Sequence, residues 1–314
     1  MAERTSRSDF RGSPGRDGAG VNLIRTFSHG DVREFDPFLM MDYFNSEDPN
    51  DYIRGFPMHP HRGIETITYL VRGEIDHEDS LGNKGAIVDG SCQWMSSGSG
   101  ILHQEMPQPS DHMLGVQVWL NLPAKRKMSQ PTYNDLTREN IPLVEEDNLK
   151  IKVLAGNYKG TVGPLVEEDT EPFFYHFESL GQANVSFETD PDYNIYFFVL
   201  EGEVEFAGKK YSMASGAVTE SGEQMSFQFS GPAHVIVLGG IPLKEPIAWG
   251  GPIVMNTQQE LNQAFADLRN GTFIQEEGRH VLRCRTKNSK ILTLSTCAGS
   301  VTSNPNDRSV RLWL

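Results

Sequence analysis

The chain has 314 residues, of which 38% are hydrophobic and 22% are charged, and its formal net charge is −14. These values are typical of a globular protein with one large core or two ordinary ones, and they exclude a disordered chain. The negative charge disfavours binding to nucleic-acid backbones and to anionic membrane surfaces. No apolar run approaches the roughly 20 residues that span a bilayer.

The N-terminal segment carries no clear targeting signal. It contains Arg and Ser, as transit peptides do, but also Glu3, Asp9 and Asp17, and it lacks an apolar stretch. We therefore predict that residues 1–20 form a flexible, solvated arm.

The three cysteines are scattered, with no disulfide framework and no Cys-x-x-Cys motif, so the predicted location is the reducing cytoplasm.

Short strand signals dominate the chain between residues 63 and 240. They are rich in β-branched and aromatic residues and are bounded by Gly, Pro, Asp or Asn. The segments are "GIETITYLV", "MLGVQVWLNL", "LKIKVLAG", "FFYHFESL", "NIYFFVLEGEVEFAG", "QMSFQFS" and "AHVIVLGG". This pattern predicts an all-β fold of barrels or sandwiches.

A weak internal repeat predicts two copies of one β-fold. "TYLVRGEIDH" and "FFVLEGEVEF" align with Gly73 and Gly202 in register. We place an N-terminal barrel at residues 21–136 and a C-terminal barrel at residues 147–278. The polar, Pro-bearing segment 131–148 joins the copies.

One amphipathic helix is predicted at residues 257–270, within the C-terminal barrel. Thr257 and Glu260 form a capping box, and Gly271 stands where a helix-terminating glycine belongs. The apolar residues recur at helical spacing: Leu261, Ala264, Phe265 and Leu268.

Residues 279–314 hold seven Lys or Arg and one Asp, and their hydrophobic residues show no clear period. This composition predicts a basic, disordered tail.

Two pairs of polar residues at alternate positions predict a metal site. His59 and His61 share one face of an extended segment, and so do His103 and Glu105. A single such pair is more often a satisfied polar pair than a metal site. Two pairs on neighbouring strands bring three imidazoles and a carboxylate together, which suits Fe(II), Mn, Co, Ni, Cu or Zn and not Ca or Mg.

The second copy has little of this chemistry. At the same offsets from Gly202 stand Glu188, Asp190, Pro232 and His234. One imidazole and two carboxylates remain, and a one-residue gap would spoil the alignment that selects them. We do not predict a second metal site there.

Four segments together resemble the pirin branch of the cupin superfamily. They are "DPFLMMDYF", "FPMHPHRGIETITYLVRGEIDHEDSLGNKG", "QWMSSGSGILHQEMP" and "GPIVMNTQQELNQAFADLRNG", and the resemblance covers residues 20 to 275. It implies a bicupin, with two cupin-type barrels and one mononuclear iron (Fe2+) in the N-terminal barrel. Other divalent transition metals are alternatives.

The resemblance also implies the ligand set His59, His61, His103 and Glu105. The general cupin order HxHxxxE…G…H would add Glu65, which shares a face with the histidines on an uninterrupted strand. A bulge at Arg62–Gly63 would turn Glu65 away. The pirin pattern leaves Glu65 out, and we follow it.

Several pirins resemble quercetin 2,3-dioxygenases, which split a flavonol with O2 and release carbon monoxide. On this hypothesis the ligands leave two open positions, the substrate is a small polyphenol, and Glu105 is the catalytic base. The predicted pocket walls are apolar residues near the metal: Phe56, Met58, Met95, Met106 and Trp94.

The alternative hypothesis is a regulatory protein that binds a protein partner according to the oxidation state of its metal. Such a protein would need an exposed patch near the metal. The candidate basic residues are Arg62, Lys125, Arg126 and Lys127. Cys92 lies beside a metal-strand motif, but we interpret it as a small buried hydrophobic residue.

Overall fold

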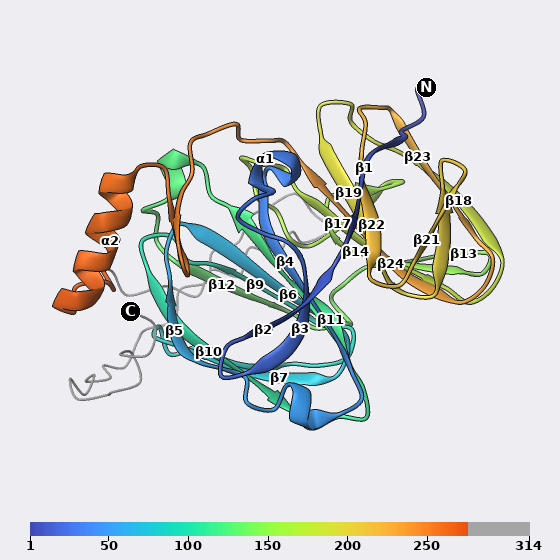
Figure 1. The fold of residues 1–314 in the computed structure, drawn as a ribbon. Coiled ribbons are helices and arrows are strands. Elements are labelled where there is room, and N and C mark those ends of the chain that lie inside the picture. Colours follow the sequence, from blue (N-terminus) through green and yellow to red (C-terminus); the bar gives the residue numbers. More distant parts are fainter. Residues whose placement is uncertain (276–314) are drawn as a thin grey trace.

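The computed structural model describes residues 1–275, which form two β-barrels side by side (Figure 1). Each barrel combines a seven-stranded and a four-stranded antiparallel sheet. The predicted all-β bicupin fold is confirmed. No helix among these residues is long and apolar enough to cross a membrane. The predicted tail at 279–314 lies outside the described residues.

The N-terminal barrel contains most of the chain up to Leu136. Its large sheet has the order β12 (Thr132–Leu136), β9 (Cys92–Ser96), β6 (Ile64–Arg72), β11 (Met113–Asn121), β4 (Phe38–Ser46), β3 (Val21–Phe27) and β2 (Ser13–Asp17). Its small sheet has the order β5 (Phe56–His61), β10 (Ile101–Gln108), β7 (Glu74–Asp79) and β8 (Lys84–Ile87). Short helices connect these strands: α1 (Val32–Phe35), and the 3-10 turns at Pro49–Asp51 and Ala124–Arg126.

The C-terminal barrel repeats this arrangement. Its large sheet has the order β1 (Ser6–Arg11), β22 (Ser215–Thr219), β19 (Asn194–Glu201), β24 (Ala233–Gly240), β17 (Phe173–Ser179), β14 (Leu149–Ala155) and β13 (Leu143–Glu146). Its small sheet has the order β18 (Ala183–Glu188), β23 (Gln224–Phe229), β20 (Glu203–Phe206) and β21 (Lys209–Ser212). The remaining elements are two strand pairs and one helix: β15 (Asn157–Tyr158) with β16 (Thr161–Val162), β25 (Ala248–Gly250) with β26 (Ile253–Met255), and α2 (Gln258–Asn270).

The predicted repeat is confirmed strand by strand. Gly73 joins β6 to β7, and Gly202 joins β19 to β20 at the equivalent place in the second barrel. Both glycines have positive φ, +108° and +77°. Residues with a Cβ atom rarely adopt this backbone conformation. The two aligned Gly-Glu motifs therefore mark the same sharp turn between the large and the small sheet.

The two seven-stranded sheets pack against each other through one apolar cluster. From the first barrel it includes Met41, Ile67, Tyr69 and Trp94, and from the second Phe174, Tyr196 and Phe198. Burial of each such side chain contributes roughly 1.5–3 kcal/mol. At the edge of this interface the Tyr69 hydroxyl and the His176 Nδ1 are 2.8 Å apart.

The N-terminal segment is not a solvated arm, so that prediction is wrong. Strand β1 pairs antiparallel with β22 and extends the large sheet of the C-terminal barrel. Arg4 is 1% exposed, and its guanidinium donates to Thr189, Thr219 and backbone carbonyls of the same barrel. The segment is polar and its partner strand belongs to the other half of the chain, so no local pattern reveals the pairing.

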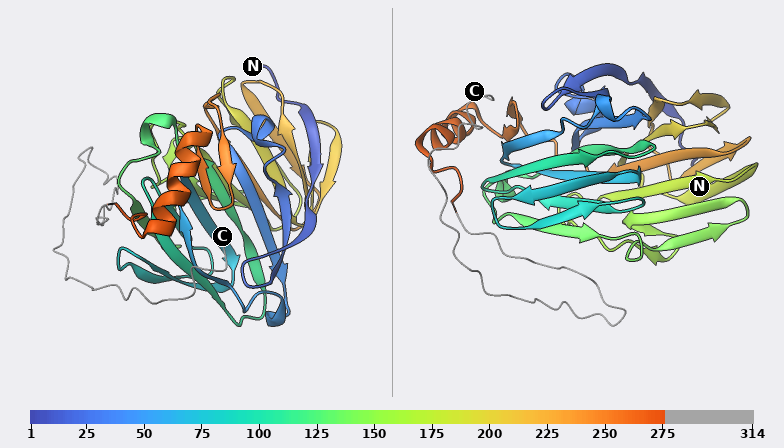
Figure 2. Two further views of the ribbon diagram at one scale, coloured as in Figure 1. Left: turned by 60° about the vertical axis from the view of Figure 1, so that its left-hand side comes forward. Right: turned by 90° about the horizontal axis from the view of Figure 1, so that it is seen from below.

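The helix prediction is confirmed, but its place was wrong. Thr257 and Glu260 form the capping box, and Gly271 ends α2 with φ of +72°. The helix does not belong to the C-terminal barrel. It lies at the outer end of the N-terminal barrel beside β5, on the side of the molecule opposite to β18 and β21 (Figure 1), and the right-hand view in Figure 2 shows the same separation from the yellow strands of the second barrel. Asp267 of α2 is ion-paired to Arg62 of the N-terminal half.

The ordered N-terminus gives a first prediction. The ring centroid of Phe10 on β1 lies 5.1 Å from the ring centroid of Phe35 and 6.0 Å from that of Phe198. We expect Phe10→Ala to lower the free energy of unfolding by about 2 kcal/mol, measured by urea denaturation. Leu180→Ala is the control, because Leu180 is 52% exposed. If Phe10→Ala is as stable as this control, the N-terminal segment does not contribute to the core, and the prediction of a solvated arm would be right.

Candidate metal centre

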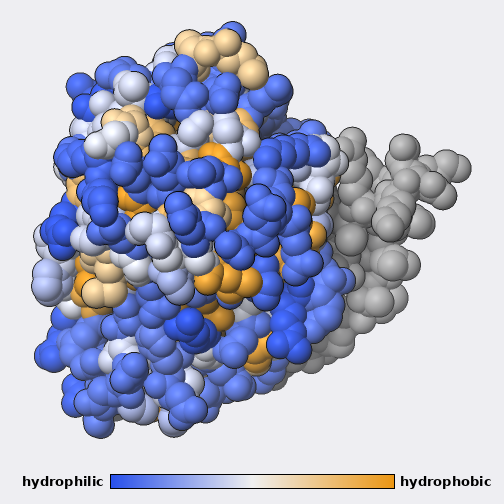
Figure 3. Space-filling view, turned by 90° about the vertical axis from the view of Figure 1, so that its right-hand side faces the viewer, coloured by the Kyte–Doolittle hydropathy of each residue, from blue (hydrophilic) through white to orange (hydrophobic). Residues whose placement is uncertain are grey.

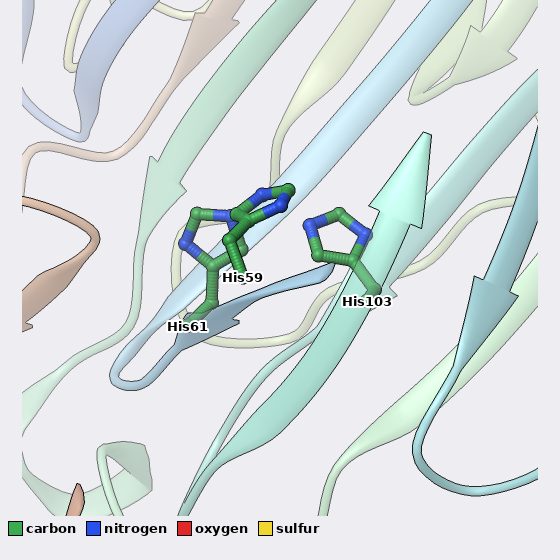
Figure 4. Close-up of side chains that lie close together, drawn as sticks. All are labelled: His59, His61 and His103. Atoms are coloured by element: carbon green, nitrogen blue, oxygen red, sulfur yellow. The ribbon is translucent and has the colours of Figure 1, made fainter. Parts of the chain in front are cut away.

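Three histidines converge in the interior of the N-terminal barrel. His59 and His61 end β5, and His103 lies opposite His59 on the neighbouring strand β10. One ring nitrogen of each histidine lies within 4.8 Å of the others. Figure 4 shows the three rings turned toward one another. The structure therefore brings together three of the four predicted ligands.

Backbone carbonyls fix the orientation of two of these rings. The Nδ1 of His59 is 2.9 Å from the Pro57 carbonyl oxygen, and the Nδ1 of His61 is 3.0 Å from that of Pro252. A carbonyl oxygen only accepts hydrogen bonds, so each Nδ1 is the protonated donor. In a neutral ring the Nε2 atom then carries a lone pair and is free of hydrogen.

Burial keeps these imidazoles neutral. Desolvation lowers the pKa of His59, and it lowers the pKa of His61 and His103 well below the ordinary value. The neighbouring imidazoles lower the last two further. Neutral imidazole is the form of histidine that binds a metal ion.

This arrangement fits a cation. The Nε2 atoms of His59 and His61 lie 3.1 Å apart, and two lone pairs at that distance repel unless positive charge lies between them. His103 is completely buried, and neither of its ring nitrogens has a hydrogen-bond partner among residues 1–275. A transition metal ion would give all three rings a partner.

Glu105 lies on the same strand as His103 but is held elsewhere. The Thr68 hydroxyl donates to its Oε1 at 2.8 Å, and the Gln117 amide donates to its Oε2 at 2.5 Å. The carboxylate is 2% exposed and does not belong to the group of three histidines. Its role as fourth ligand stays a prediction.

Glu65 faces away from the histidines. Gly63 interrupts the chain between β5 and β6 with φ of +79°, and a Cβ there would lie 2.1 Å from the Val254 carbonyl oxygen. The predicted break at Arg62–Gly63 is therefore real. The Glu65 carboxylate instead accepts a 2.7 Å hydrogen bond from Trp94 Nε1 and lines a cavity of about 70 Å³ with Glu167.

Comparison with known proteins agrees with this fold. The sequence profile of the pirin family matches residues 20–120, and that of the pirin C-terminal cupin domain matches residues 174–274. A pirin-like protein of Caulobacter vibrioides is 40% identical over 268 residues, which are 84% of this chain and 96% of that protein. The chain belongs to the pirin family.

Two further relatives of this pirin have names that refer to an activity. A Pseudomonas aeruginosa protein, whose name proposes it as a quercetin 2,3-dioxygenase, is 39% identical over 83% of this chain and 94% of its own length. A crystal structure named quercetin 2,3-dioxygenase, from Acinetobacter baumannii, matches with a TM-score of 0.81 and 29% identity. That match covers 87% of this chain and 99% of the other.

Sequence reasoning missed His77 of this pirin. On β7 it lies directly opposite Glu105, and its ring centroid is 5.4 Å from that of His103. It is 3% exposed, and its Nε2 is 3.6 Å from Asp79 Oδ2. The available signal was the alternation of Ile75, His77 and Asp79, which directs all three side chains to one face of the strand.

The predicted pocket walls are largely wrong. Trp94 belongs to the interface between the barrels, and Phe56 packs beside Phe44. Strand alternation directs Met58 and Met106 to the face opposite the histidines. The aromatic neighbour of the site is Trp119, whose ring centroid lies 5.0 Å from that of His61 and 5.8 Å from that of Trp249.

The equivalent positions of the second barrel do not converge. Glu188 is exposed, and the His234 Nδ1 lies 3.0 Å from the Nε2 of His176 at the interface between the barrels. The interior of this barrel is filled by apolar and aromatic side chains that include Phe177, Phe197 and Phe227.

The four residues of the predicted basic patch do not form one free cationic surface: two are buried, and the other two are ion-paired. Arg62 and Lys127 are 1% and 2% exposed, and both bind the C-terminal segment. Lys125 and Arg126 are ion-paired to Asp169.

Cys92 is buried, and burial raises the pKa of its thiol. This agrees with its interpretation as a small buried hydrophobic residue.

The position of Glu65 gives a second prediction. Burial and the neighbouring Glu167 raise the pKa of Glu65 to about 7, so the folded state binds this proton more tightly than the unfolded state does. The resulting stability is lost as the pH rises from about 4 to 7. We expect Glu65→Gln to be more stable than the natural protein by about 3 kcal/mol at pH 8 and about 1 kcal/mol at pH 5, measured by urea denaturation.

The same variant tests the ligand set. Because Glu65 faces away from the histidines, Glu65→Gln should bind Ni2+ with unchanged affinity, measured by isothermal titration calorimetry. A loss of Ni2+ binding would instead place Glu65 among the ligands, as the general cupin order has it.

Proposed function

We propose that this pirin is a metal-dependent dioxygenase that cleaves flavonols of the quercetin type with O2 and releases carbon monoxide. The observation that carries the proposal is the set of three neutral, buried imidazoles with converging nitrogens. The relatives named after quercetin 2,3-dioxygenase supply the substrate class.

In this proposal His59, His61, His103 and Glu105 hold one Fe2+ ion. Three imidazoles and one carboxylate suit a borderline metal. A structural zinc site with four ligands is closed, whereas an ion that prefers six ligands, as iron does, would leave room for substrate beside these four side chains. When bound, the ion would supply Lewis acidity that lowers the pKa of a flavonol hydroxyl.

Glu105 is the proposed base for the 3-hydroxyl proton of the flavonol. Its oxygens accept hydrogen bonds from Thr68 and Gln117, and its side chain lies on the same face of β10 as His103. A positioned carboxylate of this kind contributes typically 10²–10⁴-fold to rate. Removal of the hydroxyl proton leaves an electron-rich carbon in the ring, which is the atom that reacts with dioxygen.

The residues around the histidines suit a flat aromatic substrate. Trp119 borders His61, and Trp249 lies next to Trp119. Indole rings bind planar polyphenols through stacking and edge contacts. We place the reaction in the cytoplasm because the chain has three scattered cysteines and no disulfide framework.

The regulatory alternative has less support. The residues predicted for a partner-binding patch are buried or ion-paired. The end of the molecule formed by the C-terminal barrel is mainly hydrophilic, with apolar atoms scattered between polar side chains (Figure 3). Neither observation indicates a docking surface for a protein partner.

The proposal predicts turnover that depends on the site. Protein loaded with Fe(II) without oxygen should consume O2 on addition of quercetin and release carbon monoxide. His59→Ala should lose iron and activity together. Glu105→Gln should lower kcat by a factor of 10² or more, since it removes the base. An oxygen electrode and carbon monoxide detection provide the measurement.

Glu65→Gln is the matched control, because it makes the same chemical change at a buried glutamate of the same barrel outside the histidine group. It should keep the turnover of the natural protein. Stoichiometric iron without turnover of quercetin or related flavonols would refute the enzymatic proposal. A change of partner binding on oxidation of that iron would then favour the regulator.

A further inference from the structure

The loop that follows the two histidines of β5 is bound by the C-terminal segment. The Val254 amide donates to the Arg62 carbonyl oxygen at 3.1 Å. The buried ammonium of Lys127 donates to the carbonyl oxygens of Gly63 at 2.8 Å and Val254 at 2.9 Å. One cation thus links the histidine loop to β26, which comes from the far end of the described chain.

Arg62 makes a second link, to α2 and the residues after it. Its Nη1 is 2.7 Å from Asp267 Oδ2, and its Nη2 donates to the Phe273 carbonyl oxygen at 2.9 Å. The guanidinium also lies 4.3 Å from the centre of the Phe273 ring. Arg62 is 1% exposed, and removal of either partner of a buried ion pair is strongly destabilising, because it leaves an uncompensated buried charge.

The same segment touches a proposed metal ligand directly. The Pro252 carbonyl oxygen accepts the Nδ1 proton of His61 at 3.0 Å. This hydrogen bond holds the ring orientation and keeps the proton on Nδ1, so that Nε2 presents its lone pair to the site. Without it, the ring rotates more freely and the proton can move to Nε2, where it blocks metal binding.

We propose that residues 252–273 are a positioning element for the metal centre, with the Arg62–Asp267 ion pair as its main anchor. Docking of this segment sets His61 for metal binding. Since coupling between two binding events is reciprocal, metal binding must also strengthen docking of the segment. The inference rests on the metal site of the proposed function, but not on quercetin as the substrate.

The experiment removes the anchor and measures metal binding. Asp267→Asn should weaken Ni2+ binding about 10-fold or more, measured by competition with a chromophoric chelator, because loss of a partner that orients a ligand typically costs 10–100-fold in affinity. Asp267→Glu retains the charge and should recover most of the affinity. The absorption spectrum of bound Co2+ should change in Asp267→Asn and stay unchanged in Asp267→Glu.

Val235→Ala is the control for general destabilisation. Val235 is fully buried in the core of the other barrel, and its truncation should lower the urea concentration at the midpoint of unfolding without changing Ni2+ affinity. Equal losses of affinity in Val235→Ala and Asp267→Asn would overturn the proposal. Unchanged affinity in Asp267→Asn would overturn it as well.

A second measurement uses the natural protein and needs no variant. Hydrogen exchange of residues 252–273 should slow when Ni2+ is added, by the reciprocity of the coupling. Exchange unaffected by saturating Ni2+ would contradict the inference. Tight metal binding without flavonol turnover would refute only the proposed function, whereas absence of metal binding by the natural protein would overturn both.

Discussion

The packing of the two seven-stranded sheets against each other decides what each barrel can hold. A strand directs alternate side chains to opposite faces, so each residue in the interface has neighbours that face a barrel interior. On β19, Tyr196 and Phe198 join the interface, while Phe197 and Val199 fill the second barrel. On β6, Tyr69 joins the interface, and Thr68 faces inward to bind Glu105. The same sheet geometry thus builds an apolar core in one barrel and a polar site in the other.

Polar groups in the interior of the first barrel need partners, since an unsatisfied buried group costs about 1–3 kcal/mol. Most have one: Glu105 binds Thr68 and Gln117, and the Nδ1 atoms of two histidines bind carbonyls. The ring nitrogens of His103 have none among residues 1–275. Neutral rings with converging lone pairs are therefore the feature that gives this barrel its chemistry, and the second barrel has filled the same space with aromatic rings.

The two ends of the described chain cross between the barrels. Strand β1 comes from the N-terminus and completes the C-terminal barrel, while residues 252–273 come from the C-terminal half and cover the N-terminal barrel. Each barrel therefore depends on a segment from the other half of the chain. This exchange connects the fold to the proposed metal site, because the segment that crosses to the N-terminal barrel supplies a hydrogen-bond acceptor for His61.

The sequence by itself determined the features that act over short stretches of chain. Alternation placed His59 with His61 and His103 with Glu105, the repeat gave two barrels, and the capping box located the helix at residues 257–270. Only the tertiary structure decided where β1 and α2 pack, that Glu65 faces Trp94, that His77 lies opposite Glu105, and that Arg62 and Lys127 are buried. Periodicity and capping describe local backbone geometry. The partner that a residue finds in a distant part of the sequence depends on how the sheets close and pack, and no local pattern records that.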